Sequence, residues 1–96
     1  MPQWAQGADT IRKLLDLGDL QKIQGADANG QPLLDKAERT LISAVVLCEK
    51  DPGSSYTLAY DAARFACTAL LAQQGLRPTS KGGHYAVEQA VRAQFQ

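Results

Sequence analysis

The sequence predicts an all-α fold, an antiparallel up-and-down bundle of about four helices in a single domain. Four segments carry apolar residues at helical spacing, turn-forming residues separate them, and no segment alternates apolar and polar residues as a half-buried strand does. The 96 residues suffice for one core, and 45% hydrophobic with 21% charged residues is typical of a folded chain.

The first predicted helix covers residues 8–17 and ends at Gly18. Its apolar residues at helical spacing are Ile11, Leu14 and Leu15. Asp9 or Thr10 is placed to cap its start. Residues 1–7 are expected to form a flexible tail, in which Trp4 serves as a packing lid or an exposed contact.

A short piece over residues 19–23 and a polar loop over 24–30 lead to the second helix, expected at 31–49 with Pro32 in its first turn. One apolar stripe of this helix should face the core: Leu34, Ala37, Leu41, Ala44 and Cys48. Residues 51–54 turn the chain, and this short connection makes the second and third helices antiparallel neighbours.

The third helix is expected at residues 55–74, with Ser54 or Ser55 as its N-cap. Its stripe consists of Tyr56, Ala59, Ala63, Ala66 and Leu70, flanked by Tyr60, Cys67 and Leu71. Because alanine is so frequent here, the tyrosines and Phe65 are expected to supply much of the buried area. Gly75 in a left-handed conformation should end the helix.

The last helix is expected to start after Thr79 or Ser80 and to run to the end of the chain. Its apolar residues are Tyr85, Val87, Ala90, Val91 and Phe95.

Ten basic and ten acidic residues cancel, so only a local patch can attract nucleic acid. Cys48 and Cys67 are expected as buried free thiols, and without a long apolar run the chain is expected to be cytoplasmic, with no membrane contact.

The loop over residues 75–84 gathers most of the unusual side chains before a helix start. Unpaired N–H groups and a partial positive charge at a helix N-terminus favour anions, and glycine lets a phosphate approach the backbone. The candidate phosphate- or nucleotide-binding residues are Arg77, Ser80, Lys81, Gly82, Gly83 and His84. The alternative is a solvated connector whose glycines serve backbone geometry.

His84 is the single histidine and suits the role of a general base, of a hydrogen-bond donor to a phosphate oxygen or of a metal ligand. No second histidine and no cysteine cluster accompanies it, so we expect neither metal nor cofactor.

Tyr60, Asp61 and Arg64 share one side of the third helix. They form either a core seam with a solvated rim or a supporting polar site beside the loop.

Three stretches resemble the HEPN-domain family. Residues 59–64 (AYDAAR), 69–72 and 75–84 (GLRPTSKGGH) look like its central helix and following loop. Leu34-x2-Ala37-x3-Leu41-x2-Ala44 is similar to its earlier long helix, and residues 11–20 resemble the lead-in of a bacterial branch of small HEPN-like proteins.

The resemblance implies an antiparallel helical bundle that commonly forms a homodimer. Many members are metal-independent ribonucleases of toxin–antitoxin, phage-defence or RNA-processing systems. Others are non-catalytic modules that bind nucleotides or partner with a nucleotidyltransferase. Catalytic members carry Arg-x4–6-His, and Arg77-x6-His84 has this spacing. In the family the motif typically lies in a later helix with an Arg-Asn pair, and this sequence reaches Gln96 before such a helix. We therefore expect either a truncated chain or a C-terminally shortened member that lacks this helix.

Two hypotheses follow for function. The preferred one is a non-catalytic HEPN-like module acting through homodimerisation or partner binding, with nucleotide or RNA phosphate at the loop. The alternative is a metal-independent endoribonuclease in which His84 moves the proton and Arg77, with Lys81, holds the phosphate.

Overall fold

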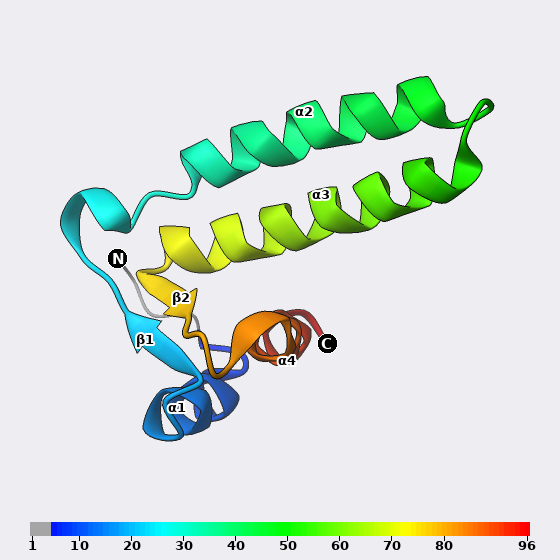
Figure 1. The fold of residues 1–96 in the computed structure, drawn as a ribbon. Coiled ribbons are helices and arrows are strands. Elements are labelled where there is room, and N and C mark those ends of the chain that lie inside the picture. The colour runs from blue at the N-terminus through cyan, green and yellow to red at the C-terminus, as the bar shows by residue number, and fades with distance from the viewer. Residues whose placement is uncertain (1–4) are drawn as a thin grey trace.

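The computed structural model describes residues 5–96 and has four α-helices, as the sequence predicts (Figure 1). They are α1 (Ala8–Asp16), α2 (Gln31–Leu47), α3 (Pro52–Gln73) and α4 (Gly83–Phe95). Between them lie strands β1 (Leu20–Lys22) and β2 (Leu76–Pro78) and a 3-10 turn, η1 (Gly25–Asp27). Trp4, the expected lid or contact residue, lies outside the described residues.

The molecule consists of a helical hairpin and a head. Helices α2 and α3 run antiparallel and form the hairpin, which projects beyond the other elements (Figure 1). We call α1, α4, the two strands and the last turns of α3 the head; in Figure 1, α1 and α4 are seen nearly end-on while the hairpin lies in the plane. The dimensions of 44 × 24 × 24 Å reflect this projection.

The hydrophobic core lies in the head. Leu20 of β1 and Leu71 of α3 are its largest fully enclosed side chains. Around them pack Ile11, Leu14, Leu76, Ala86, Val87 and Ala90. Because these residues come from α1, both strands, α3 and α4, the core joins the two ends of the chain to the base of the hairpin.

The two strands correct the expectation of a wholly helical chain. β1 and β2 pair antiparallel, with Gln21 opposite Arg77, and backbone bonds from Ile23 N to Gly75 O (2.9 Å) and Thr79 N to Asp19 O (3.0 Å) continue the pairing. Three residues are too few to show the alternation that identifies a strand. Their pairing depends on two segments that lie more than 50 positions apart in the chain.

The helix caps also differ from the prediction. Gly7, with φ of 80°, precedes α1, and neither Asp9 nor Thr10 caps it. Asp51 rather than Ser54 or Ser55 caps α3: its carboxylate accepts a hydrogen bond from Ser54 N (3.2 Å). Hydrogen bonding from the side chain and the backbone of Ser54 lowers the pKa of Asp51.

The start of α4 is later than predicted. The helix begins at Gly83, because residues 76–78 pair with β1 before the chain turns into it. Gly75 has the predicted left-handed conformation, with φ of 77°. Within residues 5–96, none of the helices combines the length and apolar character that crossing a bilayer requires.

The predicted burial of the hairpin is wrong in part. Ala37 and Ala44 of the α2 stripe are buried, whereas Leu34, Leu41 and Cys48 are exposed. On α3 the expected core tyrosines are exposed too, Tyr56 by 74% and Tyr60 by 58%. Cys67 is half-buried, and Tyr85 and Phe95 of α4 are exposed. Each hairpin helix has the other as its main neighbour, so only the row between them is enclosed.

Candidate functional site

The polar groups of residues 79–82 hold the loop against the turn that follows α1. Thr79 Oγ1 donates to Gly18 O (2.7 Å) and accepts from Gly82 N (3.1 Å). Lys81 Nζ donates to Leu17 O (2.6 Å) and lies 3.2 Å from Asp19 Oδ1. Two of the predicted phosphate-binding groups, the Lys81 ammonium and the Gly82 amide, therefore have partners within the chain.

Of the two adjacent glycines in the loop, Gly82 is required by a close contact between backbone segments. A Cβ on Gly82 would lie 2.1 Å from Asp19 O, so only glycine fits where the loop meets the turn. Gly83 has open space around it but a φ of 54°, the left-handed region that disfavours other residues. Ser80 is exposed at the loop tip.

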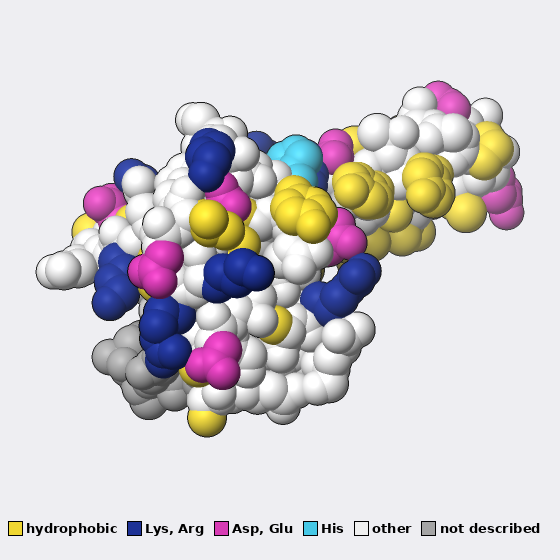
Figure 2. Space-filling view, turned by 90° about the horizontal axis from the view of Figure 1, so that it is seen from below, with side chains coloured by type: hydrophobic (Ala, Val, Ile, Leu, Met, Phe, Trp, Pro, Cys, Tyr) yellow, Lys and Arg dark blue, Asp and Glu magenta, His cyan; other side chains and the backbone are white. Residues whose placement is uncertain are grey.

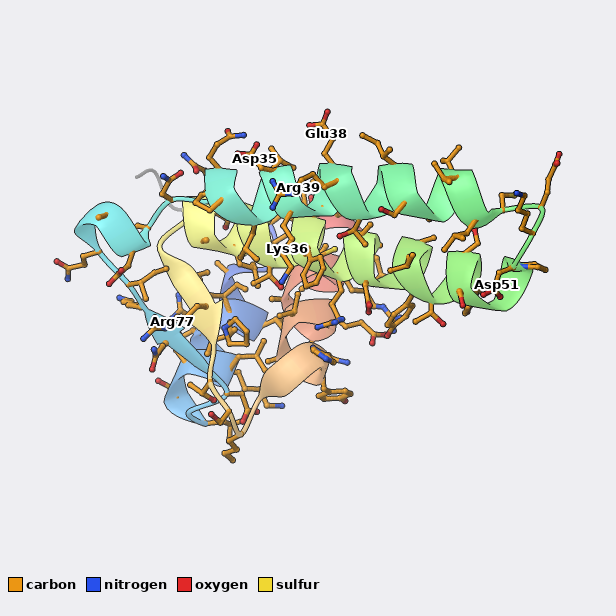
Figure 3. The ribbon with its side chains drawn as sticks, turned by 45° about the horizontal axis from the view of Figure 1, so that its top comes forward. Asp35, Lys36, Glu38, Arg39, Asp51 and Arg77 are labelled. Atoms are coloured by element: carbon orange, nitrogen blue, oxygen red, sulfur yellow. The ribbon has the colours of Figure 1, made fainter. Side chains whose placement is uncertain are left out.

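Arg77 and His84 have different partners. Arg77 lies on β2 (Figure 3). Its guanidinium donates to the side-chain oxygen of Gln21 on β1, in the amide orientation that satisfies both groups. His84 lies in the first turn of α4. None of the hydrogen bonds that the structure gives for residues 5–96 joins them, although the Arg-x6-His spacing suggested a pair.

Arg64 brings the predicted supporting residues to His84. Its Nη2 donates to Asp61 Oδ1 (3.1 Å) and its Nη1 lies 3.1 Å from His84 Nδ1. Because a guanidinium only donates, Nδ1 must accept in this contact, and the ring proton is then on Nε2. Tyr60, one turn before Arg64, is exposed beside this Asp61–Arg64–His84 cluster.

An aromatic ring supports the cluster from α3. The Arg64 guanidinium lies 5.2 Å from the centroid of the Phe65 ring, and Lys36 Nζ lies 4.5 Å from it. Figure 3 shows Lys36 pointing from α2 toward α3. Cation–π attraction of this kind helps to hold both side chains in place. No group of three metal-ligating side chains occurs among residues 5–96.

The hairpin carries on its surface several apolar side chains that the sequence assigned to the core. Figure 2 shows hydrophobic side chains gathered on the projecting hairpin. An open groove between α2 and α3 is lined by Leu34, Ala37, Glu38, Leu41, Ala59, Ala62, Ala63 and Ala66. Ile42, Val45 and Val46 add exposed apolar area on α2, each more than half exposed. We call this set, together with Tyr56 and Tyr60, the hairpin face.

Comparison with known proteins gave no matching family model, no similar curated protein and no similar solved structure. Three features of the described residues are candidates for function: the anchored loop, the Asp61–Arg64–His84 cluster and the hairpin face.

Proposed function

We propose that this protein is a non-catalytic, HEPN-like helical module that acts by forming a homodimer through the hairpin face. The observation that carries the proposal is the exposure of large apolar side chains along the whole hairpin. The two tyrosines of α3 alone leave about 250 Å² open to water. The exposed aliphatic side chains of α2 extend this apolar surface along the hairpin. A standard interface buries ~800 Å² on each partner.

The partner at the hairpin face is a second copy of this chain, because the face has both parts that a helix–helix contact needs: large side chains and a groove. Leu34, Leu41 and Val45 project from α2, while the alanines of α3 leave a shallow groove beside them. A twofold axis brings the large side chains of each copy to the small residues of the other. Two antiparallel hairpins joined in this way make a four-helix bundle, which covers the stripe that one hairpin leaves exposed.

A charged residue on the hairpin face is expected to prevent the dimer. Leu41→Glu adds a second carboxylate to the groove, which Glu38 already lines, and pairing would bury this added charge without a partner. Ser43→Glu is the matched control, because two residues along a helix turn by about 200° and the same charge then points away. Light scattering at tens of micromolar should give twice the 10.3 kDa chain mass for wild type and Ser43→Glu, and the single-chain mass for Leu41→Glu.

Unchanged helicity by circular dichroism shows that the Leu41→Glu chain remains folded, so that its mass reports association alone. A single-chain mass for wild type at these concentrations contradicts the proposal. Equal masses for the two glutamate variants would place the interface elsewhere. Nucleotide or RNA phosphate at residues 77–84 stays a separate prediction.

The second candidate function is a metal-independent endoribonuclease, which the contact between Arg64 and His84 favours. RNA cleavage at the 2′-hydroxyl needs a proton acceptor and a cation beside one phosphate. His84 is exposed, and the half-buried Arg64 is the cation next to it. In this candidate the guanidinium leaves His84 Nδ1 for the phosphate, and that nitrogen then accepts the proton. In this candidate Arg64 takes the role that sequence spacing gave to Arg77.

Cleavage of single-stranded RNA in EDTA tests the second candidate. It predicts activity in wild type, a loss of about 100-fold or more in His84→Ala and Arg64→Ala, and retention in Arg77→Ala. Loss in Arg77→Ala but not in Arg64→Ala would return the role to the Arg-x6-His pair. Absence of cleavage by wild type, or equal cleavage by all four proteins, contradicts the ribonuclease function altogether.

A further inference from the structure

The head contains a cavity on the side of β1 that faces α1 and the end of α3. Its volume is about 700 Å³, within the ~300–1,000 Å³ range of small-molecule sites. Four segments line it: α1, residues 22–28, the junction of α3 with β2, and α4. Figure 1 labels the helices and strands among them. Its lining residues differ from those of the hairpin groove, and it shares none with the Asp61–Arg64–His84 cluster.

One wall of the cavity is apolar. Ile11 of α1 and Leu76 of β2 are core residues whose remaining exposed edges line it, and Leu15 packs beside them. Ile23 completes this wall, at the point where its amide bonds to Gly75 O (2.9 Å). An apolar surface held by core residues is already formed before a ligand arrives, so little ordering opposes binding.

A second wall carries side-chain amides. Gln94, only 2% exposed, donates from Nε2 to Gln74 Oε1 (2.7 Å) and accepts from Gln74 Nε2 (3.1 Å). This reciprocal pair occupies one N–H and one lone pair of the Gln94 amide, and the amide has a second of each. A polar group this deeply enclosed at the edge of a cavity gives a ligand a fixed hydrogen-bonding partner.

The remaining charge of the lining is positive. Arg12 of α1 and Lys22 of β1 both line the cavity and are exposed, and no acidic residue is among the described lining residues. Arg12 pairs with Asp9 (3.0 Å), but both side chains are exposed, by 63% and 99%. Such a pair contributes little and leaves the guanidinium available to a ligand.

From this arrangement we propose that the head binds a small amphipathic organic anion: an apolar or aromatic body with one carboxylate or phosphate. The body lies on Ile11, Leu15 and Leu76, and the anionic group lies between Arg12 and Lys22. The cavity is separate from the hairpin face, so the inference does not depend on the dimer.

Two-dimensional NMR with three probes tests this site. Phenylacetate and phenyl phosphate share an aromatic body and distinguish the carboxylate from the phosphate, while 2-phenylethanol lacks the charge. We expect at least one anion to cause saturable shifts in the backbone amides of residues 22–25 and 74–76 and in the Gln94 side-chain amide. The neutral probe should bind at least tenfold more weakly.

The variant Arg12→Gln/Lys22→Gln should weaken anion binding at least tenfold, because it removes both cations from the opening. Arg39→Gln/Lys50→Gln removes the same charge from exposed hairpin positions and should leave binding unchanged. Three results would each overturn the proposal: no saturable shift with either anion up to about 10 mM, equal binding of 2-phenylethanol, or equal weakening in both double variants.

Discussion

Gly82→Ala is expected to destabilise the protein by about 3 kcal/mol, near the upper end of what an added methyl costs in a packed site. The new Cβ would meet Asp19 O at 2.1 Å and Asp19 C at 2.7 Å, both backbone atoms. These atoms cannot turn away as a side chain does, because Asp19 O also accepts from Thr79 N. Relief therefore requires the loop to separate from the turn after α1.

Thermal unfolding followed by circular dichroism measures this effect. For a domain of this size we expect the midpoint to fall by about 15 °C. Gly53→Ala is the control, since Gly53 lies in the first turn of a helix and the nearest atom to its Cβ is 3.9 Å away. Its midpoint should change little. Equal midpoints for the two alanine variants would contradict the close packing of Gly82.

Leu71→Ala is expected to cost about 3 kcal/mol, the usual loss when a fully buried leucine is truncated. Leu71 is 0% exposed at the centre of the head and touches the core that joins α1, both strands and α4 to α3. A total stability of roughly 5–10 kcal/mol makes this a large fraction. The truncation leaves a void inside the head. We therefore expect α1 and α4 to lose protection from amide exchange before the hairpin does.

Urea unfolding gives the free energy for this variant, and amide exchange shows where protection is lost. Leu17→Ala serves as the comparison, because Leu17 is 51% exposed and its truncation should cost less than about 1 kcal/mol. A loss for Leu71→Ala no greater than that of Leu17→Ala would contradict the position of the core.

The helices and turns could be predicted from the sequence because their signals are local. The 3-4 spacing of apolar residues, Gly75 and the turn at residues 51–54 each act within a few positions. The capping residues could not be predicted in the same way, because several polar residues stand at each helix start. Asp51 rather than Ser54 caps α3, and this choice depends on where Pro52 begins the helix.

Burial and contacts between distant residues could not be predicted in the same way. The spacing that places Tyr56 and Tyr60 on an apolar stripe is the same whether that stripe meets a core or a second molecule. Asp61 and Arg64 are recognisable as an i, i+3 pair, but the contact of Arg64 with His84 depends on how α4 packs against α3. The pairing of β1 with β2 likewise depends on the closure of the whole hairpin.

The proposed dimer requires two hairpin faces to pack against each other, and isotope-filtered NMR detects contacts of this kind between chains. A mixture of ¹³C-labelled and unlabelled chains should show intermolecular cross-peaks from the methyl groups of Leu34, Leu41 and Val45 to alanine methyls of α3. Such cross-peaks on the hairpin are the result that the proposal predicts. Their absence, or cross-peaks confined to α1 and α4 of the head, would contradict it.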